Sequence, residues 1–222
     1  MTKMKKLFFS LLAFALALPL VLAQSIQAEF ESTLPDSVRY VMPSFGPGSL
    51  LYKDGGYSRG TFNISTLDQT LRFLDTDGSE KTLADPSQVE SVSISNVLFL
   101  HVQNKYLGVV ADYGEVLLCV EKRMVFDDRK AGAYGTSSAT SSIRTVGGTY
   151  AEGGATFRFS NVKYELKETP FLYKKGRLTV PAKRSLQKLF PNKKDAIEAY
   201  LQENSVDFSN YEEVRALLDS LQ

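Results

Sequence analysis

The chain has 222 residues, of which 43% are hydrophobic and 23% charged, values typical of a globular protein rather than a disordered or fibrous one. This length predicts one domain, or one domain with an appendage. Lys and Arg total 26 and Asp and Glu total 25, so no overall field indicates a nucleic-acid binder. The single Cys and single His argue against a Cys/His zinc site and against a disulfide framework. We therefore expect no metal and no cofactor.

Residues 1–28 have the three parts of a secretory signal peptide. Three lysines form the positive start, an apolar stretch runs from Leu7 to Ala23, and small residues end the candidate cleavage sites at 21–23 and 26–28. The alternative is an uncleaved membrane anchor, but Pro19 and the small residues favour cleavage. No later segment approaches the roughly 18 apolar residues of a membrane-spanning helix. We expect an exported protein, periplasmic or secreted, with no membrane span after cleavage and no nucleic-acid partner.

Residues 29–128 are predicted to form a β-rich domain. Apolar and polar residues alternate with period two, and helical periodicity is missing. Turns are expected at 54–56, 75–78, 103–105 and 112–114. The expected strands are 50–53, 57–64, 69–74, 89–94, 97–102, 106–111 and 115–125. About seven or eight short strands at this spacing fit a sandwich, a small barrel or a meander.

Residues 129–154 are predicted to be a Gly/Ser-rich connector or loop. Gly, Ser, Thr and Ala occupy 18 of the 24 positions from 131 to 154, which leaves few apolar side chains to bury. A flexible linker is the simpler interpretation. A mobile functional loop is the alternative, because loops of this length in compact domains are often functional.

Residues 155–222 are predicted to form a strand pair followed by a helical segment. The expected elements are strands over 157–167 and 171–180 with a turn at 174–176, a short helical turn within 181–190, and a helix over 193–203 capped by Asn192. The overall class is therefore α+β.

A last helix is expected after Ser209 or Asn210, either of which is suited to cap it. Its apolar residues recur at the spacing of one helix face: Val214, Leu217, Leu218 and Leu221. Because helices this short are marginal alone, we expect them to pack on the β part or on a partner.

Three segments resemble uncharacterised exported proteins of Bacteroidetes bacteria. They are the tail over 181–221, the run GAYGTSSATSSI at 132–143 and the stretch over 50–78. The resemblance covers most of the chain after the signal and implies export and this architecture, but no established activity, cofactor or catalytic residue. For such bacteria it also implies O-glycosylation at Asp-Ser followed by an aliphatic residue, which 36–38 and 219–221 match.

Each candidate catalytic motif has a simpler structural interpretation. Gly56–Gly60 matches G-x-S-x-G, but the residues after it are typical of a strand, whereas a nucleophile elbow leads into a helix. Asp75–Gly78 is similar to a fragment of a calcium loop and lacks the later ligands, so a β-turn is expected. Asp112 and Glu115 could form a glycosidase pair only at a suitable separation. We predict no catalytic residue.

A thiol dyad of His101 and Cys119 would require the two side chains to be within hydrogen-bond reach. If the adjacent turns centre on Asn104 and Tyr113, both residues share one sheet face but lie two strands apart, about 9–10 Å. Cys119 lies in an apolar run and is expected to be a small buried side chain.

Charge segregation is the strongest functional signal. From Pro170 to Lys194 there are eight basic residues and no acidic one, and from Asp195 to Gln222 there are seven acidic residues with Arg215 as the one basic residue. In the simpler interpretation the two segments are solvated faces that pair with each other. In the functional interpretation the basic run binds an anionic envelope component or an acidic protein. The candidate binding residues are Lys174, Lys175, Arg177, Lys183, Arg184 and Lys188.

These features favour a non-enzymatic binding or interaction module of the cell envelope. The alternative is a carboxylate-dependent hydrolase acting on envelope glycans or peptides, which needs two convergent acids in a concave site. A structural subunit, the third possibility, would present an unpaired edge strand.

Overall fold

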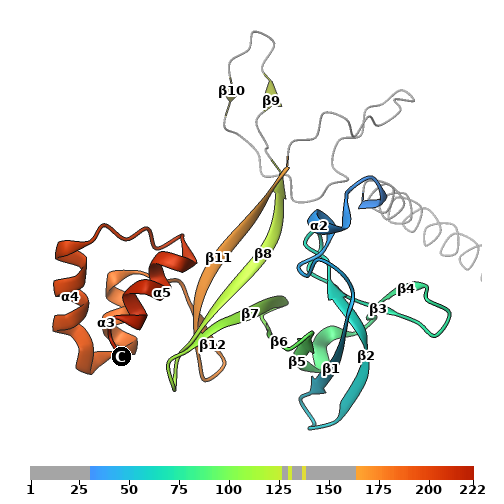
Figure 1. Ribbon diagram of the computed structural model, residues 1–222, viewed down its shortest axis with the longest axis horizontal. Helices are drawn as coiled ribbons and strands as arrows, with labels where there is room; N and C mark the ends of the chain where they lie inside the picture. Colours follow the sequence, from blue (N-terminus) through green and yellow to red (C-terminus); the bar gives the residue numbers. More distant parts are fainter. Residues whose placement is uncertain (1–30, 127–129, 132–136, 139–163) are drawn as a thin grey trace, which may run out of the picture. The chain divides into compact units, whose positions relative to one another are not determined.

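The computed structural model describes residues 31–126, 130–131, 137–138 and 164–222 (Figure 1). Residues 36–125 and 166–222 belong to one compact unit, and the other described residues belong to a second. The first unit carries nearly all of the main sheet and the helices at the end of the chain. The predicted signal peptide and nearly all of the predicted connector lie outside the described residues.

Ten antiparallel strands form one sheet, in the order β12-β11-β8-β7-β6-β5-β1-β2-β3-β4 (Figure 1). In chain order they are β1 (Gly46–Tyr52), β2 (Tyr57–Ile64), β3 (Leu71–Leu74), β4 (Glu80–Thr82), β5 (Val89–Ile94), β6 (Val97–Val102), β7 (Lys105–Asp112), β8 (Leu117–Phe126), β11 (Tyr164–Lys174) and β12 (Arg177–Thr179). A separate pair consists of β9 (Lys130–Ala131) and β10 (Ser137–Ser138). With the short helices given below, this confirms a β-rich α+β fold. Both edge strands of the large sheet, β12 and β4, have three residues.

Tight turns join most neighbouring strands, largely where the sequence predicts them. Two consecutive residues with positive φ close the turns at 95–96, 103–104 and 175–176. This left-handed pair matches the right-handed twist of the flanking strands, which is why two-residue hairpins prefer it. The turn at 95–96 joins the predicted strands 89–94 and 97–102, whose bounds the structure reproduces as β5 and β6.

The predicted register of His101 is wrong. The turn after β6 has only two residues, 103–104, so His101 pairs with Tyr106 and stacks on its ring with 4.6 Å between the centroids. Cys119 pairs with Val109, three residues beyond Tyr106 on β7. Because successive residues of a strand point to opposite faces, His101 and Cys119 lie on opposite faces of the sheet. They form no dyad.

The predicted break between two C-terminal strands is absent. β11 continues through residues 167–171 as one strand of eleven residues, and only the turn at Lys175 and Gly176 ends the pairing before β12. Pro170 is buried and does not interrupt the strand. β11 also pairs with β8, so the residues after the connector complete the same sheet.

The sheet curls until β8 meets the loop between β2 and β3. The backbone N–H of Met124 donates to the carbonyl of Thr66 at 2.9 Å, and the Gln69 side chain donates to the carbonyl of Lys122 at 3.1 Å. Five strands lie between β8 and β3 in the sheet order, so this contact requires the sheet to bend back on itself. Of the three expected arrangements, the small barrel is the closest.

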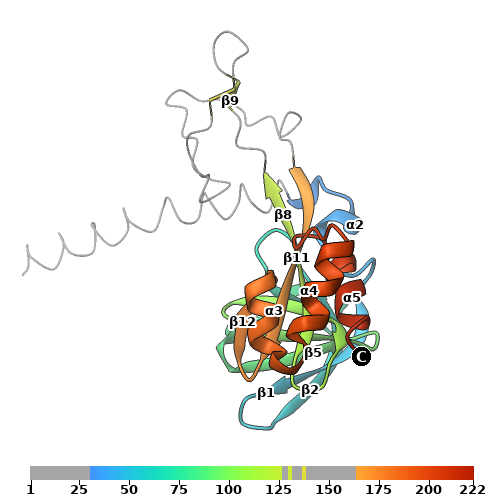
Figure 2. The same cartoon turned by 90° about the vertical axis from the view of Figure 1, so that its left-hand side faces the viewer.

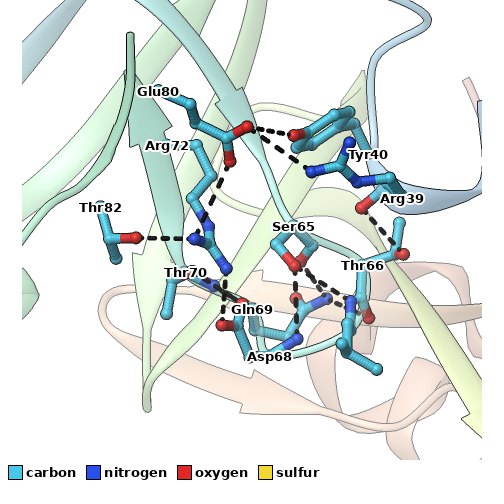
Figure 3. Close-up of polar contacts among 11 residues, drawn as sticks. Arg39, Tyr40, Ser65, Thr66, Asp68, Gln69, Thr70, Arg72, Glu80 and Thr82 are labelled. Carbon is cyan, nitrogen blue, oxygen red and sulfur yellow. Dashed lines mark hydrogen bonds and ion pairs between the residues drawn. The ribbon is translucent and has the colours of Figure 1, made fainter. Parts of the chain in front are cut away.

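A polar network connects the loop between β2 and β3 to β3, β4 and residues 39–40 (Figure 3). The Arg72 guanidinium donates to Asp68 at 2.9 Å and lies 3.8 Å from Glu80. Glu80 in turn accepts a hydrogen bond of 2.6 Å from the Tyr40 hydroxyl, and Arg39 lies 3.6 Å away. The charges of this network are paired with one another, so it serves to fix the loop and β4.

Two hydrophobic cores lie on the sheet. The first fills the inside of the curl with Leu50, Phe62, Ile64, Leu71, Val89, Val92, Ile94, Phe99 and Tyr106. The second joins β8 and β11 to the C-terminal helices and contains Val116, Leu118, Leu172, Leu186, Ile197, Val214, Leu217, Leu218 and Leu221. The predicted stripe of the last helix is thus buried against the β part.

Three helices cover this second core: α3 (Lys183–Leu189), α4 (Lys194–Glu203) and α5 (Tyr211–Asp219) (Figure 2). Shorter helical turns are α2 (Asp36–Arg39), η1 (Pro86–Gln88) and η3 (Pro191–Lys193). Asn210 caps α5 as predicted, accepting from the N–H of Glu212. The predicted cap of α4 is wrong, because Asn192 lies within η3 and the N-cap position falls on Lys193. Among the described residues, no helix is long and apolar enough to cross a membrane.

Candidate functional site

Four of the six candidate binding residues line one cleft. Lys174 ends β11, Lys175 lies in the hairpin turn, Arg177 begins β12, and Lys188 lies on the last turn of α3. The cleft between the hairpin and α3 has a volume of about 420 Å³. Figure 2 shows α3 beside β12, and Lys188 of α3 lines the cleft together with Arg177 of β12.

The other two candidates do not line this cleft. Lys183 pairs with Glu198 of α4, with 2.6 Å between the nitrogen and the carboxylate oxygen. Arg184 is exposed on α3 and is not among the residues that line the cleft. Pairing between the basic and acidic segments, the simpler interpretation of the charge pattern, therefore accounts for Lys183.

Three further side chains complete the cleft: Thr179, Ser185 and Leu189. The Ser185 hydroxyl lies 2.9 Å from the carbonyls of both Val180 and Ala182, so its proton is used within the protein. Toward a ligand, Ser185 can act only as an acceptor, and the anion-binding donors are the basic side chains.

A second, smaller hollow of about 260 Å³ adjoins the cleft. The two share Lys174 and Leu189 as lining residues. Four polar side chains line the smaller hollow, and three of them are charged: Glu115, Lys174, Asn192 and Lys193. The other lining residues are Tyr113, Val116, Leu189, Phe190 and Pro191. We call the larger hollow the basic cleft and the smaller one the side hollow.

Glu115 is the one acid among the described residues that line these two hollows. Its carboxylate lies 2.8 Å from the Lys174 nitrogen and 3.7 Å from that of Lys175. The hydrogen bond from Lys174, with the charges of both lysines, lowers the pKa of Glu115 below its usual value. Glu115 therefore stays ionised at neutral pH and offsets part of the local positive charge.

Three cations around the hollows are not neutralised in this way. Arg177, Lys188 and Lys193 have no acidic group within ion-pair distance in the part of the chain that the structure describes. Arg177 and Lys188 are exposed, so an incoming anion can reach them. An arginine guanidinium offers paired N–H groups that match a carboxylate or phosphate, and a lysine adds a mobile point charge.

The other motifs have structural roles. Ser58, the central residue of the G-x-S-x-G motif, lies on β2, and a strand rather than a helix continues after it. The segment 75–78 forms a β-turn in which the Gly78 N–H donates to the Asp75 carbonyl at 2.9 Å. Within the described ranges, no group of three or more His, Cys, Asp or Glu is placed to hold a metal ion.

Cys119 is fully buried, as the sequence predicts, and burial raises the pKa of its thiol to about 12. A thiol with so high a pKa is protonated at neutral pH and is a poor nucleophile. Asp112 accepts a hydrogen bond from the Gly114 N–H at 2.8 Å and does not line either hollow.

Sequence reasoning considered Glu115 only as half of a glycosidase pair with Asp112, and predicted neither its contact with Lys174 nor the side hollow. Glu115 precedes β8 and meets Lys174 only because β8 and β11 are neighbours in the sheet. Nothing local in the sequence marks this meeting. In comparisons with protein-family models, with curated proteins and with solved structures, no match to this chain was found.

Proposed function

We propose that the protein is a non-enzymatic binding module of the cell envelope that holds an anionic partner in the basic cleft. The observation that carries the proposal is the group Arg177, Lys188 and Lys193, three cations around two adjoining hollows without a described acidic partner. The export signal and the resemblance to exported Bacteroidetes proteins support the location, periplasmic or secreted.

No observation favours the hydrolase alternative. That chemistry needs two carboxylates converging on one concave site. The described lining of the two hollows contains one carboxylate, Glu115, and two lysines engage it. The structural-subunit alternative is no better supported, because each edge strand of the large sheet has only three residues to offer a partner.

Binding of a polyanion tests the proposed function. The chain purified after export is titrated into fluorescein-labelled poly-L-glutamate and, separately, dextran sulfate, with anisotropy as the readout. The variant Arg177→Glu/Lys188→Glu should bind at least about tenfold more weakly, which corresponds to about 1.4 kcal/mol. Binding by the natural chain should also weaken as salt is raised, because exposed charges are screened.

The matched control is Lys81→Glu/Lys194→Glu. It makes the same change in net charge at two exposed positions that line neither hollow. We expect less than a threefold loss. Equal losses in both double variants would show that net charge rather than the basic cleft controls binding, and would contradict the proposal.

Export has its own test. Expression of the full chain in a Gram-negative host should place it in the periplasm or medium, with an N-terminus at residue 24 or 29. A protein that kept residue 1 and fractionated with the cytoplasm would contradict the envelope location.

A further inference from the structure

We infer, on the basis of the proposed function, that the anion held in the basic cleft is a terminal phosphate group, the phosphomonoester of a small molecule. The inference is carried by the juxtaposition of three kinds of donor along one cleft: the guanidinium of Arg177, the ammonium of Lys188 and the hydroxyl of Thr179. No carboxylate lines this cleft within the part of the chain that the structure describes.

Two positive side chains of the cleft are held directly opposite each other. Lys174 of β11 is the cross-strand partner of Arg177 of β12. Like charges at such a position repel and destabilise a sheet. Glu115 lies 2.8 Å from Lys174, but no acid in the described ranges lies within ion-pair distance of Arg177. An anion bound beside Arg177 would therefore relieve a repulsion that the protein's own side chains relieve only in part.

Thr179 adds a neutral donor next to Arg177. The two residues are two positions apart on β12, so their side chains point to the same face, about 6–7 Å apart along the strand. The Thr179 hydroxyl has no hydrogen-bond partner among the described residues. Ser185, the other hydroxyl of the cleft, has its proton committed to the protein's own carbonyls. Thr179 is therefore the hydroxyl of this cleft that can donate to a ligand.

A phosphomonoester uses these donors more fully than a carboxylate does. A carboxylate has two oxygens, and one guanidinium can bind both of them. A phosphomonoester has three acceptor oxygens and a charge of about −1.5 to −2 at pH 7. Two of its oxygens can accept from Arg177 while the third accepts from Thr179 or Lys188. The hydroxyl and the second cation thus have a partner in a phosphate that a single carboxylate does not provide.

The size of the cleft indicates a small ligand. Its volume of about 420 Å³ lies within the range of small-molecule sites, roughly 300–1,000 Å³. Leu189 and the methylene groups of the lysines supply apolar wall beside the charged groups. We therefore expect the phosphate at the end of a compact molecule such as a sugar phosphate or glycerol phosphate.

The test compares glycerol 3-phosphate with succinate, whose two carboxylates give it about the same total charge. Amide chemical-shift titrations by NMR at about pH 8 should give at least about fivefold tighter binding for glycerol 3-phosphate, with the largest shifts in the hairpin and α3. Thr179→Val removes the hydroxyl and nearly keeps the shape of the side chain. It should weaken binding of glycerol 3-phosphate by about fivefold, which is the loss of one hydrogen bond, and change that of succinate less than twofold.

Thr169→Val is the matched control, because Thr169 is half-buried on β11 and lines neither hollow. It should leave the affinity for both ligands unchanged. Circular dichroism and the thermal midpoint establish that both variants are folded, so a loss of affinity in Thr179→Val reports on the hydroxyl.

The outcomes separate this inference from the proposed function. Equal affinities for the two small ligands, both weakened by Arg177→Glu/Lys188→Glu, would overturn the inference and leave the proposed function standing. Binding of poly-L-glutamate or dextran sulfate but of neither small ligand would do the same and would assign the cleft to an extended polyanion. If neither the small ligands nor the polyanions bind, both are overturned.

Discussion

The Lys174 side-chain nitrogen lies 2.8 Å from the carboxylate of Glu115; Lys174 lines both the basic cleft and the side hollow, and Glu115 lines the side hollow. The two residues are 59 positions apart in the sequence and meet because β8 and β11 are neighbours. Glu115 is therefore an internal competitor for any anion that approaches Lys174 and Lys175.

Removal of this competitor should strengthen anion binding. We expect Glu115→Gln to bind poly-L-glutamate about three- to tenfold more tightly, because two lysines lose their internal partner and the local field becomes more positive. The thermal midpoint should change little, since exposed ion pairs contribute little to stability. Glu90→Gln, an exposed change on β5 away from the site, should leave affinity unchanged. Weaker binding by Glu115→Gln would show that Glu115 supports the ligand rather than competing with it.

The single histidine gives a specific pH dependence. Burial lowers the pKa of His101 below 6.5, because the charged imidazolium loses solvation beside Tyr106. The unfolded chain takes up this proton more readily than the folded protein. Stability is therefore fully present above about pH 6.5 and declines as pH falls toward the folded-state pKa. The thermal midpoint should therefore decrease when the pH is lowered from 7.5 to 5.5.

His101→Phe is the control for this dependence. The variant keeps a ring that can stack on Tyr106 and has no group that titrates near neutral pH. Its thermal midpoint should change less with pH than that of the natural chain over the same range. An unchanged slope would assign the dependence to other groups.

Gly48 of β1 pairs with Ile94 of β5, and no side chain separates it from the β5 backbone. A Cβ at this position would overlap the backbone carbonyl oxygen of Ser93, and backbone cannot move aside cheaply. We expect Gly48→Ala to lower the free energy of unfolding by about 1–3 kcal/mol, measured by urea denaturation. At Gly56 a Cβ would meet only the mobile carboxylate of Asp54, so Gly56→Ala should cost much less. Similar costs at both positions would contradict this explanation.

Gln69 closes the curl of the sheet. It is 7% exposed, and its side-chain amide donates to the Lys122 carbonyl at 3.1 Å. Gln69→Ala should destabilise the protein by about 1–2 kcal/mol, because the part-buried Lys122 carbonyl loses a donor. Gln103 has nearly the same backbone conformation, with φ of 54° against 57°, but is exposed. Gln103→Ala should therefore be nearly neutral, and a cost equal to that at Gln69 would point to backbone conformation instead.

The last helix is part of the core and not a detachable tail. Leu217 is fully buried with Leu118 of β8 and Leu172 of β11. Leu217→Ala should cost about 2–5 kcal/mol in urea denaturation. Arg215→Ala, on the exposed side of the same helix, should cost less than about 1 kcal/mol. Equal effects would mean that the helix contributes little to the second core.

Local patterns predicted the elements that depend on local physics. The turns at 54–56, 75–78 and 112–114, most of the strands and the buried stripe of α5 all follow from residues close together in the sequence. The register of His101 could not be predicted in this way. A turn of two residues instead of three shifts the strand pairing by one residue, and a side chain then faces a partner on the other face of the sheet. The predicted boundary between two strands near Pro170 was wrong for a related reason, because pairing with neighbouring strands outweighs local sequence preferences.

The sequence by itself determined the β-rich class and a run of eight basic residues near its end, and it predicts the export signal. Only the tertiary structure decided that four of the six candidate cations share a cleft, that Lys183 pairs with Glu198, and that Glu115 reaches Lys174. The reason is the range of the interactions. Turn and helix preferences act over a few residues, whereas the site is assembled by strand order and helix packing, which join residues far apart in the chain.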